Sequence, residues 1–383
     1  MKIRIGLALA CSPSSLMAQA VPPGPPPPGP PPIVTAPVLS SANALGRRVQ
    51  AWMPGEVRCG GDPVAAVQWR RPYQTLGWAR TPPTPISYRF RIAADGRPLS
   101  IAKAIPTSYL FGVEDVAPSL AASRFAPGTE RGDCTVTYTP RLTSFAETPV
   151  EDLVSYTLNP LSGPLPREGW AAIFPAAATC DDEPKPAPLN QAFPDYDKVP
   201  GTPGVRDWTL LGYDTDDDGV PKNIGVVTGT RNAALDAAGA AALARSRYAG
   251  GRRTGCRFPY VKTADILPAP AMPATATFQT AAPPAACKAG WATKPPLRYP
   301  APYRRRAIEG WAVIGFDVAP WGATGNVRVL ESEPAADFGE QAADLIRAAR
   351  RAPSPSGATG CVERVRFQMG RPGMAPDTEM VAD

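Results

Sequence analysis

Six of the seven cysteines divide this sequence of 383 residues at nearly regular intervals. Taken in consecutive pairs, they are separated by 75, 76 and 74 residues. Equal spacing of this kind is typical of an internal repeat in which every copy keeps the same landmarks. The repeat singles out one pairing among the many that six cysteines allow. The predicted pairs are Cys59 with Cys134, Cys180 with Cys256, and Cys287 with Cys361.

Further landmarks lie between the cysteines of each pair. A glycine lies near the middle of the segment, and an aromatic residue lies six residues before it. An arginine lies shortly before the second cysteine. Because these landmarks keep the same order three times, the sequence predicts three tandem copies of one module. They are Phe90, Gly96 and Arg124 in the first copy, Tyr213, Gly219 and Arg247 in the second, and Phe316, Gly322 and Arg350 in the third.

Each predicted disulfide closes a loop of about 75 residues, which stabilises the fold by roughly 4 kcal/mol in the chain-entropy model. Such bonds need an oxidising compartment. Two alternatives stay open from the sequence, because the cysteines could instead be buried free thiols or metal ligands. The chain has no CxxC spacing, so we expect no metal site.

The N-terminus has the features of an export signal. The basic start MKIR is followed by an apolar run from Ile5 to Met17 and by a small-x-small cleavage site at Ala18-Gln19-Ala20. We therefore predict a signal peptide over residues 1–20 and a periplasmic location. The alternatives are lipid attachment at Cys11 and retention of the segment as an inner-membrane anchor.

Proline-rich stretches mark the predicted domain boundaries. The chain contains 50 prolines, and proline is excluded from helix interiors and central strands. We expect residues 21–40 to form an extended polyproline spacer. The remaining predicted parts are module 1 over 41–145, module 2 over 163–262, a Pro/Ala-rich linker over 263–282, module 3 over 283–370 and a disordered tail over 371–383.

Hydrophobic periodicity predicts two strands, a helix and a third strand within each copy. In the third copy, alternation over residues 311–318 and 327–329 predicts a hairpin with one buried face. Glu333-Pro334 then opens an amphipathic helix, and alternation resumes over residues 361–369. The predicted fold class is α+β, with three tandem small strand-strand-helix-strand modules that each contain one disulfide.

The chain contains no histidine. This excludes Ser-His-Asp and Cys-His catalytic groups and the commonest general base. The sequence contains no recognisable nucleophile and base pair and no Gly-rich phosphate loop, so we expect neither an enzyme nor a cofactor. The net charge of +6 is too small to indicate a nucleic-acid partner. The alternative that remains is an enzyme, or an enzyme inhibitor, of the cell envelope.

Several motifs of the third copy match one family. They are Tyr299-Pro300, Glu309-Gly310-Trp311 before the first strand, Gly325-Asn326-Val327 in the second strand, Ser332 before the helix and residues 350–353 before the last strand. With these motifs the third copy resembles the C-terminal domain of TonB, the periplasmic energy-transducing protein of Gram-negative bacteria. The two upstream copies resemble it through Arg124-Phe125-Ala126-Pro127 and Arg247-Tyr248-Ala249-Gly250.

The resemblance implies a binding function. In the family, this domain captures a short extended peptide of outer-membrane receptors by strand addition at an exposed sheet edge, which uses backbone groups and no catalytic side chain. We therefore expect a non-catalytic, TonB-like protein whose partner is a peptide of an outer-membrane receptor or another envelope protein. The expected partner-strand residues, on the last strand of the third module, are Val362, Arg364, Val365, Arg366 and Phe367, of which Val362, Arg364 and Arg366 face outward.

The resemblance also implies an alternative function. The chain would then be an energy transducer of TonB-dependent transmembrane transport, anchored in the inner membrane by its N-terminal segment. An inner-membrane proton-channel complex would be a further partner in that case.

Two polar clusters are further candidate sites. Arg304, Arg305 and Arg306 form a basic run that predicts an anionic-ligand patch on the surface, with a solvated surface as the alternative. The segment from Asp214 to Gly219 resembles the start of a calcium loop, but its twelfth position is Gly225, where such a loop needs a glutamate. A polar hairpin turn is therefore the favoured interpretation of the second cluster.

Overall fold

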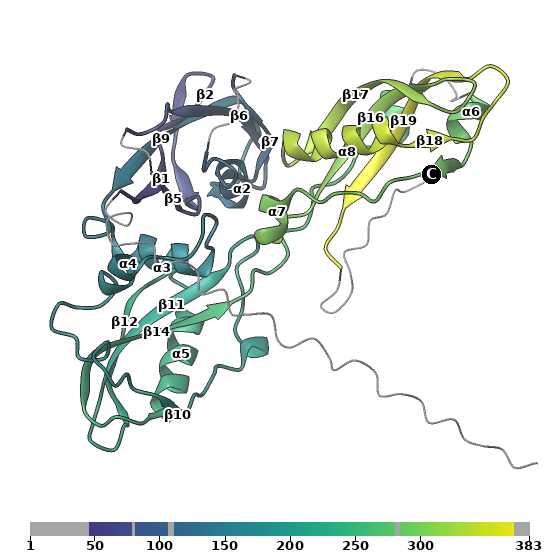
Figure 1. The fold of residues 1–383 in the computed structure, drawn as a ribbon. Coiled ribbons are helices and arrows are strands. Elements are labelled where there is room, and N and C mark those ends of the chain that lie inside the picture. The colour runs from purple at the N-terminus through teal and green to yellow at the C-terminus, as the bar shows by residue number, and fades with distance from the viewer. Residues whose placement is uncertain (1–45, 79–80, 106–110, 280–283, 371–383) are drawn as a thin grey trace, which may run out of the picture.

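The computed structural model of this chain describes residues 46–78, 81–105, 111–279 and 284–370. They form a mixed α/β structure with three main sheets, each of which carries a helix (Figure 1). The predicted signal peptide, the proline-rich spacer and the C-terminal tail lie outside the described residues. Among the described helices, none is both long and apolar enough to cross a membrane.

The first sheet has seven strands and is larger than its sequence pattern predicts. Its elements are β1 (Arg48–Pro54), β2 (Val57–Cys59), β3 (Asp62–Val64), β5 (Thr75–Gly77), β6 (Ile86–Ile92), β7 (Pro98–Lys103), helix α2 (Val116–Ala122) and β9 (Arg131–Thr143). The expected hairpin is β6 and β7, and the expected last strand is β9. However, β9 is paired along both edges, with β6 on one side and with β1 and β2 on the other. The segment before the hairpin therefore adds strands that its alternation did not reveal.

The second and third sheets share one arrangement of three strands. In both, the first strand of a hairpin lies between its partner and the last strand, and the helix packs on the hairpin. The second sheet contains β11 (Asp207–Thr215), β12 (Pro221–Gly229), α5 (Ala233–Arg245) and β14 (Arg253–Lys262). The third contains β16 (Gly310–Val318), β17 (Thr324–Glu333), α8 (Ala336–Ala348) and β19 (Ala358–Phe367).

Short elements complete the described structure. Next to each main sheet, two short strands pair with each other: β4 (Ala66–Gln68) with β8 (Arg124–Phe125), β10 (Pro188–Asn190) with β13 (Arg247–Tyr248), and β15 (Trp291–Thr293) with β18 (Arg350–Arg351). The connections contain α3 (Val150–Leu158), α4 (Arg167–Ala171), η1 (Tyr196–Lys198), η2 (Thr275–Phe278), α6 (Ala285–Lys288) and α7 (Ala301–Arg305).

The hairpin glycines have the same backbone role in all three sheets. Gly96, Gly219 and Gly322 have φ values of +82°, +70° and +85°, a region that a side chain disfavours. A Cβ at any of them would also collide with the carbonyl of the short strand after the helix. In return, each glycine carbonyl accepts a hydrogen bond from that strand, at 2.9 to 3.0 Å. Glycine is therefore required at these positions by both φ and close approach.

The three disulfides join the cysteine pairs predicted from the spacing. Each one ties a segment that precedes the hairpin to the last strand of its sheet. The cysteines are buried within the apolar cores. The disulfides thus connect the ends of each strand-strand-helix-strand segment through its core.

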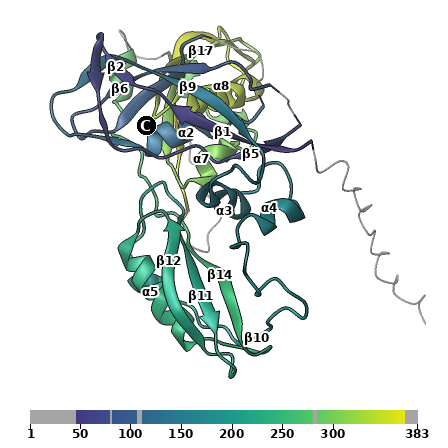
Figure 2. The ribbon, with the colours of Figure 1, turned by 90° about the vertical axis from the view of Figure 1, so that its left-hand side faces the viewer.

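The apolar cores connect sheets that are distant in sequence. One continuous core contains residues of both the first and the third sheet, although the whole second sheet lies between them in the chain. The first and third sheets accordingly lie side by side, with α8 and β7 at their junction (Figures 1 and 2). A second core, formed around α3 by Leu153 and Tyr156, links the first sheet to Trp208 and Leu210 of the second.

We predict that removal of the third disulfide lowers the free energy of unfolding by about 4 kcal/mol, because its loop is of 74 residues. The test is urea unfolding of exported protein, comparing the double variant Cys287→Ser/Cys361→Ser with the oxidised parent. Reduced parent protein is the control and is expected to be destabilised at least as much. Equal stability of the variant and the oxidised parent would contradict the prediction.

Candidate functional site

The outer edge of the third sheet is formed by β19. On its inner side β19 pairs with β16, from Gly310 opposite Phe367 to Val318 opposite Ala358. Among the described residues, no strand pairs with its other side. An edge of this kind presents unpaired backbone N–H and C=O groups, to which an extended peptide can add as a further strand.

The side chains of β19 alternate between the core and the opposite face. Val365 and Phe367 are 0% and 1% exposed and pack in the core, whereas Val362, Arg364 and Arg366 are partly exposed. Phe367 meets Phe338 of α8 edge to face, with 5.1 Å between ring centroids. Val365 and Phe367 were predicted as partner contacts, but burial leaves only their backbone groups for that role.

The predicted Pro/Ala-rich linker contacts the face of the third sheet that carries the arginines. The indole Nε1 of Trp311 donates a hydrogen bond to the carbonyl of Pro270 at 2.9 Å. Arg364 donates a longer one, at 3.4 Å, to the carbonyl of Pro273. Trp311 lies opposite Arg366 in the register and is 2% exposed. Residues 268–273 therefore cover the first residues of β16, a packing role that their composition did not predict.

A buried ion pair also supports β19 from the core side. Glu363 accepts a hydrogen bond from Nη2 of Arg351 at 2.6 Å, and both side chains are less than 10% exposed. The guanidinium carbon of Arg351 lies 3.7 Å from the centre of the Trp291 ring, a favourable cation–π contact. Burial raises the pKa of Glu363, and Arg351 opposes this effect. The alternation of the strand, which places Glu363 inward, was the only sequence signal for this pair.

This edge lies within a segment that a family model recognises. Residues 295–369 match the Gram-negative bacterial TonB protein C-terminal family. The matched segment includes α7, both hairpin strands, α8 and β19, so the resemblance expected from the motifs is confirmed there. A comparison of the chain with curated proteins found no match.

The basic run at the start of this TonB-like segment does not form a surface patch. Arg304 is exposed and Arg305 half-buried, but Arg306 is only 2% exposed. The prediction that all three arginines form one anionic-ligand surface is therefore wrong for Arg306. The side chain is buried because the third sheet docks on the first at this point.

Arg306 is the centre of that docking contact. Its Nε donates to Oδ1 of Asp115 at 2.7 Å, and its Nη2 donates to Oδ2 of Asp115 at 2.5 Å. Nη2 also donates to the carbonyl of Arg71 at 2.9 Å, and the guanidinium lies 4.2 Å from the centre of the Tyr73 ring. Burial alone would lower the pKa of Arg306, but Asp115 outweighs it and the pKa is raised. The third sheet is thus held to the first by a bidentate ion pair shielded from water.

Glu333 forms a second polar contact between the same two sheets. It is 1% exposed and accepts hydrogen bonds from the backbone N–H and the hydroxyl of Ser100, at 2.6 and 2.7 Å, and from Arg91 at 2.9 Å. The backbone N–H of Ile101 donates to the carbonyl of Pro334 at 3.0 Å. Glu333 was expected only as the start of a helix, and its partners lie more than 230 residues earlier in the chain.

The acidic segment of the second sheet forms the expected hairpin turn. Asp216 accepts from the backbone N–H groups of Asp218 and Val220 at 3.1 and 2.9 Å, and Asp217 pairs with Arg252 at 2.9 Å. The Asp216 carboxylate is thus bound within its own loop, and the Asp217 carboxylate is bound to the segment before β14. No group of three or more potential metal ligands occurs in the part of the chain that the structure describes.

We predict that Arg306→Leu lowers the free energy of unfolding by about 3–5 kcal/mol, because it leaves the Asp115 carboxylate buried without its cation. The double variant Arg306→Leu/Asp115→Leu is expected to lose less. Urea unfolding of the four proteins of this mutant cycle is the measurement. The matched control is Arg304→Leu, an exposed neighbour, with a change within about 0.5 kcal/mol. If Arg306→Leu were no worse than Arg304→Leu, the pair would not hold the two sheets together.

Proposed function

We propose that this chain is a non-catalytic periplasmic protein that binds an extended peptide of an outer-membrane or other envelope protein by strand addition to β19. The observation that carries the proposal is the edge of β19, which lies inside the segment that matches the TonB C-terminal family and pairs with no further strand among the described residues. Strand addition requires backbone groups and alternating side-chain contacts, which this edge offers without any catalytic group. The predicted export signal supports the periplasmic location.

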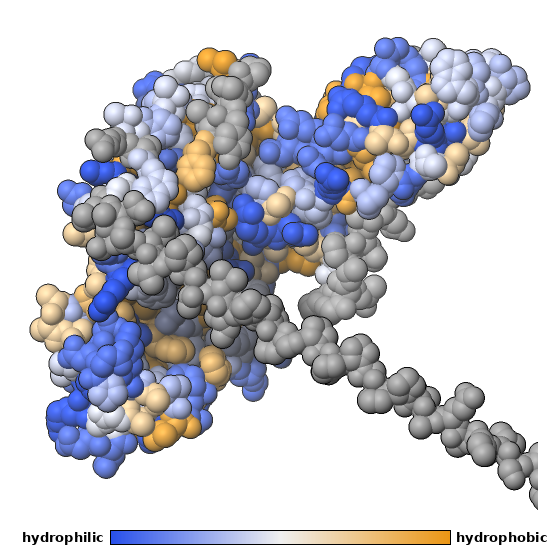
Figure 3. All heavy atoms as spheres, in the orientation of Figure 1, coloured by the Kyte–Doolittle hydropathy of each residue, from blue (hydrophilic) through white to orange (hydrophobic). Residues whose placement is uncertain are grey.

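Charge along the β19 edge favours an acidic peptide. Arg364 and Arg366 are both partly exposed on one face of the strand, and positive side chains on an edge also discourage pairing with a second copy of the same edge. The view in Figure 3 shows a mostly hydrophilic surface over the third sheet, with apolar residues in small patches. Recognition through the backbone with charge complementarity is consistent with such a surface.

We infer further that the three disulfide-linked segments are tandem copies of one module, within the boundaries 41–145, 163–262 and 283–370. For the second and third copies, support comes from contacts that recur at equivalent positions. Asp214 accepts from Asn223 and from the N–H of Gly255, at 2.8 and 2.9 Å. Asp317 accepts from Asn326 and from the N–H of Gly360, at 2.6 and 2.9 Å. Each aspartate follows the landmark aromatic residue, and each asparagine follows the hairpin glycine at the same distance.

Among the described residues, only the third copy combines the family match with a last strand that pairs along one edge alone. In the first copy, the corresponding strand β9 is already paired on both edges. In the second copy, the corresponding strand β14 contains Pro259, which has no backbone N–H to donate. We therefore assign peptide binding to the third copy and a structural role to the other two.

We predict that a photo-crosslinking amino acid placed at Val362 or Arg366 in cells couples to a segment of one envelope protein. The matched control position is Arg328, which is exposed on β17 at the opposite edge of the same sheet. Mass spectrometry of the products identifies the peptide. Equal coupling from Arg328, or none from either β19 position, would contradict the assignment of this edge.

The identified peptide then allows strand addition itself to be tested. Along an added strand, backbone N–H groups point alternately toward and away from β19. N-methylation of single peptide residues should therefore weaken binding at every second position, measured by calorimetric titration. If replacement of the peptide's side chains weakens binding but N-methylation does not, the peptide binds in a groove and not as an added strand.

A further inference from the structure

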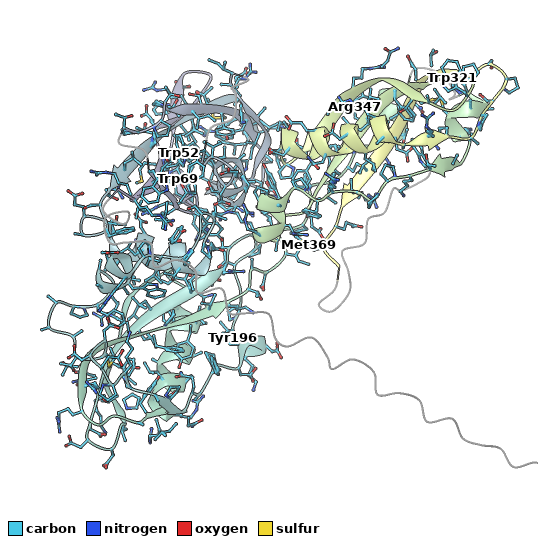
Figure 4. All side chains as sticks on the ribbon, viewed as in Figure 1. Trp52, Trp69, Tyr196, Trp321, Arg347 and Met369 are labelled. Atoms are coloured by element: carbon cyan, nitrogen blue, oxygen red, sulfur yellow. A yellow bond between two sulfur atoms is a disulfide. The ribbon has the colours of Figure 1, made fainter. Side chains whose placement is uncertain are left out.

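A cavity of about 410 Å³ lies where the first sheet, α3 and the second sheet meet. Its wall is formed by residues 67–74, which run from the end of β4 toward β5, by residues of α3, and by the ends of β11 and β12. Trp69, one of the lining residues, is labelled in Figure 4. The volume is within the range of about 300–1,000 Å³ that is usual for small-molecule sites.

The cavity is rich in arginine. Five arginines line it, against the two carboxylates of Glu151 and Asp152. Two of these cations are already neutralised, because Arg306 pairs with Asp115 and Arg71 pairs with Asp152. The other three, Arg70, Arg206 and Arg231, form no ion pair with any residue that the structure describes. The cavity therefore has an excess of positive charge.

Two hydrogen-bond donors of residues that line the cavity are buried without a partner among the described residues. They are Nε of Arg70 and the hydroxyl of Tyr73, a residue that is 8% exposed. Burial lowers the pKa of Arg70, with Asp207 acting in the opposite direction. Unmet donors of this kind cost free energy, and a side-chain rotation that turned them into the cavity would let a bound anion accept hydrogen bonds from them.

Gln74 adds one unmet acceptor to the same wall. It is 2% exposed, and its Nε2 donates to Oδ1 of Asp152 at 3.0 Å. That bond fixes the orientation of the amide, because the opposite orientation would place its oxygen against the carboxylate. Its Oε1 has no hydrogen-bond partner in the part of the chain that the structure describes. A hydroxyl group of a ligand would satisfy this oxygen.

We propose that this cavity is a binding site for a small hydroxylated oxyanion, a carboxylate or a phosphate, held by Arg70, Arg206 and Arg231. The planar guanidinium group is suited to both anions because its N–H groups can donate in parallel to two oxygens. The hydroxyl of Tyr73 donates to the same anion, and Gln74 accepts from the hydroxyl of the ligand. The site is separate from the β19 edge and does not depend on the proposed peptide binding.

Calorimetric titration of the full mature chain tests the proposal with three probes. Citrate has carboxylates and a hydroxyl, tricarballylate is the same molecule without the hydroxyl, and inorganic phosphate represents the alternative source of the oxyanion. We expect saturable binding of citrate or phosphate, with citrate bound more tightly than tricarballylate if the carboxylate is the true ligand. No saturable heat with any of the three probes would overturn the proposal.

Variants assign the binding to this cavity. Arg70→Gln and Arg231→Gln are each expected to weaken binding by about tenfold or more, as loss of a charge-assisted hydrogen bond does. Gln74→Glu should abolish it by adding a negative charge. The control Arg347→Gln removes an exposed arginine of α8 that lies far from Trp69 in Figure 4, and it should leave affinity unchanged.

The control variant Arg347→Gln also distinguishes binding in this cavity from general attraction of the anion to a positively charged protein. Because Arg231 is exposed, its replacement tests the proposal even if Arg70→Gln folds poorly. Equal weakening by Arg347→Gln and Arg231→Gln would mean that the anion binds through overall charge, and the proposal would be wrong. Unchanged affinity in Arg231→Gln and Arg70→Gln would have the same consequence.

Discussion

The position of the third sheet depends on one buried ion pair, between Arg306 and Asp115. Both side chains are at most 2% exposed, so neither charge can be left without the other. The pair joins the residue after α7 to the residue before α2, and it aligns the apolar surfaces that become one core. The same guanidinium stacks on Tyr73 and lines the cavity beside the second sheet. The junction of the first and third sheets is therefore organised around this contact.

A comparison of equivalent positions explains why the first sheet, and not the second, accepts the third. In the second and third sheets, an aspartate after the landmark aromatic residue binds an asparagine of its own hairpin. In the first sheet these positions are Arg91 and Ser100, and both bind Glu333 of the third sheet. A contact within one hairpin is thus replaced by a contact between sheets. The replacement of a negative by a positive side chain gives the buried Glu333 its counter-charge.

The proposed division of roles among the sheets follows from the strand pairing at their edges. Strand addition needs an open edge, and β9 has none because β1 and β2 pair with it. The last strand of the third sheet pairs with a strand on one edge only in the described part of the chain, while the adjacent face is covered by residues 268–273. The proposed division of roles therefore places peptide binding at one edge, while the other two sheets serve for docking and for the walls of a cavity.

Local sequence patterns determined the disulfides, turns and strands of this protein. Tertiary contacts determined which side chains become buried and which partners they bind. Cysteine spacing, hairpin glycines and hydrophobic alternation predicted the disulfides, the turns and the inward positions of Val365 and Phe367, because these depend on covalent geometry and on periods of a few residues. The extra strands of the first sheet, the burial of Arg306 and the partners of Glu333 could not be predicted in this way. Nothing in a run of three arginines distinguishes the one that meets an aspartate 191 residues earlier. That distinction arises only when two sheets dock, since the free energy of a buried charge depends on what surrounds it in space.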